Sequence, residues 1–585
     1  MPSDLRRLSG QIVDLHQRRV FPGTVEWRRG RITRVVEDPT VREKHLIMPG
    51  LVDAHIHIES SLLPPAEFAR LAVIHGTVAT VSDPHEIANV LGARGVVYMI
   101  KDGKRTPLKF NFGAPSCVPA TTFETAGATL DANAVSRLLA RPDIRYLAEV
   151  MNFPGVLGGD PALRTMMKVA TALGKPIDGH APGLRGEQAR AYAAAGPSTD
   201  HECFTLAEAQ DKLAAGMKIL IREGSAARNF AALAPLLKTH PDRVMFCCDD
   251  LHPDLLVGGH LDRHVRRALA TGADRFDVLR CASVNPVEHY GLDVGLLRAG
   301  EPADFIVVDG FRKFRVQRTY LRGELVASQG RSKLPRLRSA EPNQFRAQPR
   351  PAADFALRWD ALTPTRQVQR LGDKPLHPQT NVIEPLHPQA NVIEALHPKI
   401  NVIEALNGQL ITQQRLVAAK VVDGRIVADP KHDVLKIAVV NRYVPRAPVA
   451  VGFIHGVGLK SGAIASSVAH DSHNIAVIGA DDASIARAVN LVIKHCGGLS
   501  AVGRGRTAVL PLPIAGLMSN LDGRTAARRY TQLDRMAKQL GSKLDAPFMT
   551  LSFMALLVIP DLKLSDRGLF SAAKWGFVPV CTAKE

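Results

Sequence analysis

From Leu51 to about Leu292 the sequence repeats one pattern, in which a short apolar stretch is followed by a longer stretch with helical spacing. This alternation is typical of βα units, whose strands pair in parallel while their helices cover the sheet. The span suits eight such units and predicts an α/β fold built on a TIM-like (β/α)8 barrel, residues 49–292. A chain of 585 residues is too long for one core, so further domains are expected around the barrel.

Residues 60–84 illustrate one unit. Ser60 and Ser61 are candidate caps for a helix that begins at Pro64 or Pro65 and ends at Gly76. The next strand is TVATVSD, which Pro84 terminates.

The segments that flank the barrel predict β structure. Residues 10–50 alternate apolar and polar positions, and the alternation returns after Leu292 in LLRAGEPADFIVVDG and TYLRGELVASQG. We therefore expect a composite β-sandwich from residues 1–48 and 293–335. A C-terminal α+β domain is expected over 406–585, with strands GAIASSVA and NIAVIGA and a helix DDASIARAVNLVIKH capped by Asp481 or Asp482.

Residues 336–405 form a basic linker and a decapeptide repeat whose units begin at Leu376, Leu386 and Leu396. A His-Pro turn followed by an Asn-Val-Ile strand fits each unit. A duplicated linker is favoured over a metal site built from His377, His387 and His397, because three short units bury little surface.

The formal net charge of +18 raises the question of nucleic-acid binding. Much of the excess lies between Arg312 and Arg350, where few aromatic side chains are available to stack on bases. A solvated basic surface is the preferred interpretation, and no nucleic-acid partner is expected.

Neither end of the chain nor its cysteines indicate export or membrane insertion. Met1 to Gly10 lacks the apolar stretch of a secretory signal, and the apolar run Pro547 to Pro560 is too short to span a bilayer. The seven cysteines contain no CxxC pair and predict reduced, mostly buried thiols. A cytoplasmic protein without a membrane partner is the expectation.

Histidines and carboxylates follow one predicted strand after another. The strongest case is His55-x-His57, because alternation points both imidazoles to one strand face. Catalytic groups collect at the C-terminal ends of barrel strands. Each candidate alone is as well explained by a packed or capping residue, but jointly they suit a metal pair. The others are Asp83, His85, Glu149, His180, His201, Asp249 and Asp250.

The segment PGLVDAHIHIESSLLPPAEFARLAVIHGTVATVSDPHEIANVLG resembles the start of the amidohydrolase barrel in bacterial adenine deaminases. NPVEHYGL and GEPADFIVVD resemble that superfamily's barrel exit. The resemblance continues in APSCVPAT, AEVMNFPGV, GHAPGL, IREGSAARN and CCDDLHPDLL. It extends to LKSGAIASSVAHDSHNIAVIG and LSFMALLVIPDLKLSDRGLF near the C-terminus.

The resemblance implies a metal pair. His55 and His57 would hold one ion, Glu149 would bridge both, His180 and His201 would hold the second, and Asp249 would bind metal and transfer protons. Mn²⁺ is favoured and Fe²⁺ is the alternative. Dihydroorotases and hydantoinases carry a carbamylated lysine at the bridging position, whereas AEVMNF offers none.

The implied reaction is hydrolysis of adenine, a small-molecule substrate, to hypoxanthine and ammonia, with Asp249 and Glu149 as the catalytic residues. Arg222, Glu223 and Ser225 are candidates for binding the purine edge, although Arg222 and Glu223 fit a surface ion pair equally well. The main alternative is an amidohydrolase that acts on a cyclic amide or on another aminated heterocycle. A silent scaffold is disfavoured because all six ligand positions are filled.

A second set of residues is left without a role. AHDSHN contains His470, Asp471 and His473, which with Asp83 and His85 form a candidate additional site. A tight Asx-type turn between strands is the competing interpretation. A homodimer is left open.

Overall fold

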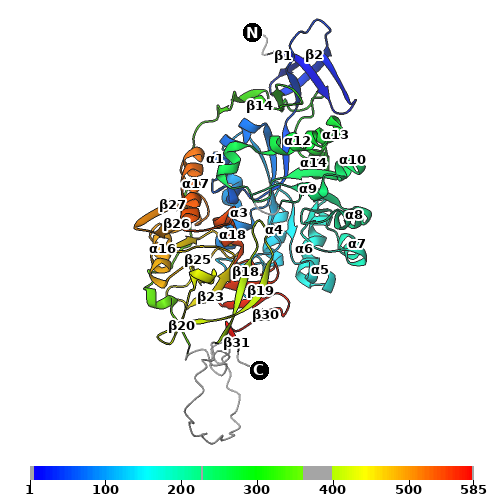
Figure 1. Cartoon of the computed structure of the whole chain (residues 1–585). Helices are drawn as coiled ribbons and strands as arrows, with labels where there is room; N and C mark the ends of the chain where they lie inside the picture. Colours follow the sequence, from blue (N-terminus) through cyan, green and yellow to red (C-terminus); the bar gives the residue numbers. More distant parts are fainter. Residues whose placement is uncertain (1–4, 226–227, 360–397, 583–585) are drawn as a thin grey trace, which may run out of the picture.

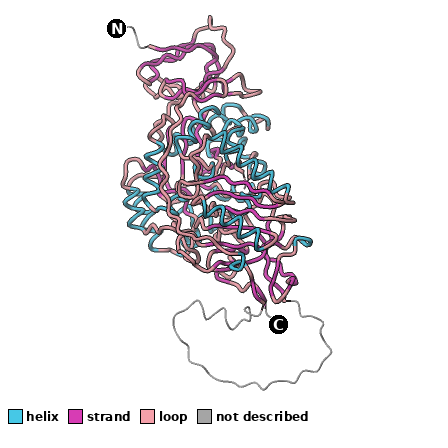
Figure 2. Tube along the Cα trace, turned by 90° about the vertical axis from the view of Figure 1, so that its left-hand side faces the viewer, coloured by secondary structure: helices cyan, strands magenta, loops and turns pink. Residues whose placement is uncertain are grey.

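The computed structural model describes residues 5–225, 228–359 and 398–582, and nothing in it concerns the remaining residues. Most of the decapeptide repeat lies outside this description. Strands β1–β3 lie at one end of an elongated molecule, the barrel helices in its middle, and β18 and β30 at the other end (Figures 1 and 2).

The segments before and after the barrel join in one eight-stranded sheet, so they form a composite β unit as predicted. β4 pairs in parallel with β1 and antiparallel with β13, which connects the N-terminal strands to those that follow the barrel. Its core includes Trp27 against Phe305. The strands, in sheet order, are β16 (Arg331–Ser332), β15 (Glu324–Ser328), β14 (Val316–Leu321), β13 (Phe305–Val308), β4 (Leu46–Pro49), β1 (Arg6–Asp14), β2 (Arg19–Arg28) and β3 (Arg31–Glu37).

The predicted barrel is present as eight parallel strands in sequence order. They are β5 (Leu51–Ile56), β6 (Thr77–Ser82), β7 (Lys109–Ala114), β8 (Ile144–Val150), β9 (Ile177–Gly179), β10 (Thr199–Asp200), β11 (Lys218–Arg222) and β12 (Val244–Cys247). The last strand returns to the first, because the amide of Asp249 donates to the His55 carbonyl at 2.9 Å. The amide of His57 donates in turn to the Asp249 carbonyl at 3.2 Å. The barrel therefore closes at the positions where metal ligands are expected.

Helices separate and cover these strands. They are α1 (Pro65–Ala72), α2 (His85–Leu91), α3 (Ala93–Gly103), α4 (Ala132–Leu139), α5 (Phe153–Gly158), α6 (Pro161–Ala172), α7 (Gly186–Ala194), α8 (Leu206–Ala214), α9 (Phe230–Leu233), α10 (Leu236–Thr239), α11 (Pro253–Gly258), α12 (Leu261–Ala270), α13 (Arg275–Cys281) and α14 (Val284–Tyr290).

The predicted caps of α1 were wrong. Ser60 and Ser61 belong to a separate 3-10 helix, η1 (Ile58–Ser61), and the chain then passes through Leu62 in the left-handed conformation. Pro64 occupies the N-cap position of α1 and provides no side-chain cap. The Ser60 hydroxyl donates instead to the carboxylate of Asp250, across the mouth of the barrel.

The C-terminal region is an α+β unit around a sheet with β19 (Thr412–Ala418), β18 (Lys399–Ala405), β23 (Val449–His455), β22 (Leu435–Val440), β25 (Ile475–Gly479), β24 (Ala463–Ser466), β26 (Gly498–Gly503) and β27 (Arg506–Pro511) in order. β31 (Cys581–Thr582) pairs with β18. β18 comes from the third repeat unit, which was predicted to belong to the linker. Its Asn-Val-Ile stretch forms the strand expected there. β18 belongs to this sheet because it forms seven residue pairs with β19 and also pairs in parallel with β23.

Helices complete this region, namely α16 (Asp482–Lys494), α17 (Gly523–Gln539) and α18 (Pro547–Phe553). The Asp481 carboxylate caps α16, as predicted, by accepting the Ser484 amide at 2.7 Å. The small strands are β28 (Leu562–Ser565), β29 (Gly568–Ser571) and β30 (Gly576–Phe577), with β17 (Leu357–Arg358), β20 (Lys420–Val422) and β21 (Arg425–Val427) in another sheet.

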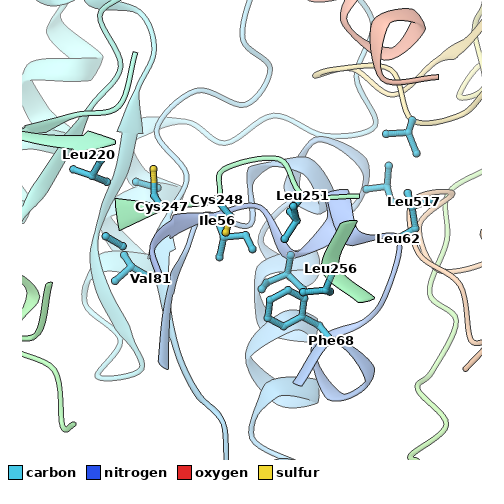
Figure 3. Close-up of a cluster of buried hydrophobic side chains, with 14 of the residues drawn as sticks. Ile56, Leu62, Phe68, Val81, Leu220, Cys247, Cys248, Leu251, Leu256 and Leu517 are labelled. Carbon is cyan, nitrogen blue, oxygen red and sulfur yellow. The ribbon is translucent and has the colours of Figure 1, made fainter. Parts of the chain in front are cut away.

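The C-terminal region packs directly on the barrel. α17 lies beside α1 (Figure 1), and the Gly523 amide donates to the Glu67 carboxylate at 2.9 Å. Leu517 lies next to Leu62 of the barrel (Figure 3), where the Ser519 amide donates to the Leu62 carbonyl at 2.8 Å. These contacts place the C-terminal region over the strand ends that carry the candidate site.

Two further expectations can be compared with the described residues. All seven cysteines are free, and Cys496 is the exposed one among them. No helix in the described part of the chain has the length and apolar character needed to cross a membrane. The run from Pro547 folds as α18, whose side chains are buried.

Gly50, where β4 passes into the barrel, tests how tightly this junction is packed. A Cβ atom at Gly50 would lie 2.2 Å from Val78 Cγ1. We expect Gly50→Ala to destabilise the protein by about 1–3 kcal/mol through overpacking, seen as a lower calorimetric unfolding midpoint. Combining it with Val78→Ala should give a smaller loss than the sum of the two single changes. An unchanged midpoint for Gly50→Ala would contradict this packing.

Candidate metal centre

Glu149, near the end of β8, is the point on which the predicted ligands converge. Its Oε2 lies 2.7 Å from His180 Nδ1 and 3.1 Å from His201 Nε2. Its Oε1 lies 3.5 Å from His57 Nε2 and 3.3 Å from His85 Nδ1. The carboxylate is 3% exposed. The two oxygens thus face different imidazole pairs, as a bridging carboxylate requires.

Asp249 follows β12 and faces the histidines that end β5. Its Oδ1 lies 3.0 Å from His57 Nε2 and 3.6 Å from His55 Nε2. Its Oδ2 accepts a hydrogen bond from Arg222 Nη1 at 2.6 Å. One oxygen therefore faces the ligand cluster while the guanidinium holds the other.

The donor atoms fit divalent metal ions. His55 Nε2 and His57 Nε2 are 3.2 Å apart, so both can present a lone pair to a cation between them. The groups of ligand atoms that lie mutually within 4.8 Å among the described residues include His55–His57–Asp249, His55–Glu149–His201, His180–His201–Glu202 and His57–Asp83–His85–Glu149. His55 Nδ1 is buried without a hydrogen-bond partner. Imidazole and carboxylate together suit borderline divalent cations.

The charges of this centre favour ionised carboxylates. Burial alone would raise the pKa of Glu149, but His180 and His201 hold that pKa well below its ordinary value. Burial likewise opposes ionisation of Asp249, and Arg222 together with His55 and His57 holds its pKa well below the usual range. Both groups are consequently anionic at neutral pH, as metal ligands must be.

The substrate-binding candidates lie in different surroundings. Arg222 is 1% exposed and pairs with Asp249 and with Glu202, so it belongs to a buried ion pair rather than to a surface one. Glu223 pairs with Arg267 away from the centre. The Ser225 hydroxyl accepts the His252 amide at 2.8 Å. Their roles toward a purine stay predictions.

A cavity of about 1000 Å³ lies between the barrel loops and the C-terminal region. Its barrel wall includes residues close in sequence to predicted ligands, such as Pro182, two residues after His180, and Phe204, three residues after His201. The opposite wall comes from residues 406–411 and 545–560, including Phe553. Ser225 also lines it. This space is therefore bounded by both the barrel and the C-terminal region.

The candidate additional residues also come together. His85 Nδ1 lies 3.2 Å from Asp83 Oδ2, while His85 Nε2 lies 3.8 Å from Asp471 Oδ1. His470 and His473 both contact the carboxylate of Glu86. The AHDSHN segment thus reaches the barrel at α2.

Sequence analysis missed two carboxylates of this region. Glu202 directly follows His201, and its Oε1 lies 3.4 Å from that residue's Nε2. Glu86 directly follows His85. Both lie after strands, where the other candidates were found, so the same positional signal was available for them.

Removing the charge of Arg222 tests the centre's electrostatics. Arg222→Met would leave Glu202 and Asp249 buried without their cation, so we expect the pKa of Asp249 to rise and metal affinity to fall about 10–100-fold. Competition with a chelator dye measures the affinity. Arg267→Met, at the more exposed ion pair with Glu223, is the matched control and should bind metal like the parent. Equal affinities in all three proteins would contradict the assigned role of Arg222.

Comparison with known proteins accounts for both halves of the chain. Residues 46–326 match the model of the amidohydrolase family, and residues 409–575 match the adenine deaminase C-terminal domain. A protein from Salinibacter ruber named adenine deaminase is 54% identical over 98% of each chain. Proteins of that name from a Sulfurovum species and from Borreliella burgdorferi are 51% and 41% identical, over 98% of this chain and 99% and 100% of their own. The chain therefore belongs to the adenine deaminase family of amidohydrolases.

Proposed function

We propose that this protein hydrolyses adenine to hypoxanthine and ammonia at a divalent metal pair. Its proposed ligands are His55, His57, Glu149, His180, His201 and Asp249. The observation that carries the proposal is the placement of Glu149, whose Oε2 faces His180 and His201 while its Oε1 faces His57. Adenine as the substrate is supported by the full-length similarity to proteins named adenine deaminase.

The metal we assign is Mn²⁺, with Fe²⁺ as the alternative. Imidazole and carboxylate ligands accept either ion, and the absence of a thiolate from the set disfavours softer metals. When bound, such a pair supplies Lewis acidity that lowers the pKa of a water molecule and stabilises developing negative charge.

Asp249 is the group we assign to proton transfer. Its Oδ1 faces the ligand cluster, whereas its Oδ2 is fixed by Arg222, so the carboxylate can accept a proton from the attacking water without rotating away. As the water oxygen bonds to C6 of adenine, Asp249 carries its proton to the ring or to the amino group. The C6–N bond then breaks, ammonia leaves, and the ring retains the oxygen.

Arg222 and Glu202 support this proton transfer from one side. The guanidinium lies between the two carboxylates, and the positive charge keeps the pKa of Asp249 low between turnovers. Glu149 shares the negative charge of the centre and is the second group we assign to catalysis.

The cavity beside the centre is the proposed route for adenine. Its apolar surfaces, including Phe204 and Phe553, suit a flat heterocycle, and Ser225 offers a hydroxyl at its edge. The cytoplasm is the proposed location, since none of the seven cysteines forms a disulfide in the structure.

The first test is an activity assay on protein stripped of metal and reloaded with Mn²⁺. We expect release of ammonia and hypoxanthine from adenine, and no ring opening of dihydroorotate or hydantoin, because the bridging group is Glu149 rather than a carbamylated lysine. Lack of turnover of adenine by the reloaded protein would refute the function.

Variants of the two carboxylates test the site. Glu149→Gln and Asp249→Asn should each lower kcat by about 10²–10⁴-fold, the usual contribution of a positioned proton-transfer group, or more where metal is also lost. Glu187→Gln, on the exposed face of α7, is the control that should match the parent. A kcat equal to that of the parent in either active-site variant would contradict the assignment of Glu149 and Asp249 as catalytic residues.

A further inference from the structure

A second cluster of metal-ligating side chains lies where the C-terminal region meets the barrel. Its centre is Glu86, the second residue of α2, whose Oε1 contacts His470 Nδ1. His85 Nε2 lies 3.3 Å from the same oxygen and 3.8 Å from Asp471 Oδ1. The side chains of these four residues are at most 5% exposed. Two imidazole nitrogens and two carboxylate oxygens therefore meet in a space closed to solvent.

His473 has a different place in the cluster. Its Nδ1 accepts the amide of Ala469 at 3.3 Å, which assigns the ring proton of the neutral imidazole to Nε2. That Nε2 faces Glu86 Oε2 and donates to it. His473 thereby fixes the orientation of Glu86 and leaves Oε1 directed at His85 and His470. Hydrogen bonds of this kind position carboxylate ligands at metal sites.

His85 is oriented in a comparable way. Its Nδ1 faces carboxylate oxygens, at 3.2 Å from Asp83 Oδ2 and 3.3 Å from Glu149 Oε1. With the proton on that side, Nε2 presents its lone pair to Glu86 and Asp471. The opposite ring nitrogen of a metal-ligating histidine commonly faces a carboxylate in this manner.

One feature of the cluster calls for a cation. Asp471 Oδ2 is buried and has no hydrogen-bond partner. Burying such a carboxylate is costly unless a positive charge balances it. A divalent ion would neutralise Glu86 and Asp471 together and would use the lone pairs of His85 and His470.

We propose that His85 Nε2, Glu86 Oε1, His470 Nδ1 and Asp471 Oδ1 form a further site for one divalent cation, separate from the pair at Glu149. Two imidazoles and two carboxylates suit a borderline ion such as Zn²⁺ in four-coordinate geometry. Since His470 and Asp471 belong to the C-terminal region and His85 and Glu86 to the barrel, the ion cross-links the two. It also lies one imidazole ring away from Glu149.

Metal content of the full chain tests the site. Protein loaded with excess Zn²⁺ and freed of loose metal is analysed by mass spectrometry of the elements, beside His470→Gln, Asp471→Asn and the surface control His432→Gln. We expect three equivalents in the parent and in His432→Gln, and two in each of the other variants. The proposal is overturned when His470→Gln and Asp471→Asn retain as many equivalents as the parent.

Because a variant can fail by misfolding, His473 supplies a second comparison. His473→Gln keeps a donor for Glu86 Oε2 and should retain the third equivalent, whereas His473→Leu removes the donor and should lose it. Addition of Zn²⁺ to stripped protein should raise the unfolding midpoint less in His470→Gln than in the parent. Equal shifts in both would also overturn the site.

The metal-content test of this site can be distinguished from the test of adenine deamination. Glu149→Gln should lose metal from the pair while it keeps the ion at Glu86, and His470→Gln should do the reverse. If the parent did not deaminate adenine, the metal equivalent expected at Glu86 would be unaffected.

Discussion

The contact between the buried Glu149 carboxylate and imidazoles from four segments of the barrel is the interaction on which this structure depends. An isolated carboxylate in this position would be unstable, since desolvation of a charge costs far more than a typical hydrogen bond restores. The contacts at 2.7–3.5 Å with His57, His85, His180 and His201 offset that cost. They also require four strand ends to meet at one point, which closure of the barrel provides.

Polar groups beneath the centre hold those strand ends in place. Asp53 Oδ1 accepts the amides of His55 at 3.3 Å and Cys248 at 3.1 Å, and so joins the first and last strands. Lys212 Nζ contacts Asp200 at 3.1 Å and donates to the Ala181 carbonyl at 2.6 Å, tying the loops after β9 and β10 together. The position of each ligand therefore depends on neighbours that never touch the metal.

Sequence reasoning predicted the barrel because its fold depends on local regularities, whereas the six proposed ligands were implied by the family resemblance, and their roles stay predictions. Strand and helix periodicity is visible along the chain, and a residue after an apolar strand must lie at the barrel's C-terminal face. It could not predict Glu202 with Arg222, since that pair joins residues from different strands. Nor could it place His470 against Glu86, which are 384 residues apart in sequence. The helix caps at Ser60 and Ser61 failed because Leu62 turns the chain between them and α1.

The central claim is that one carboxylate bridges two ions, and anomalous diffraction from crystals of the Mn²⁺-loaded protein tests it most directly. We expect two manganese peaks on either side of Glu149, one beside His55, His57 and Asp249 and the other beside His180 and His201. A single peak at this position, or two peaks that Glu149 does not join, would contradict it.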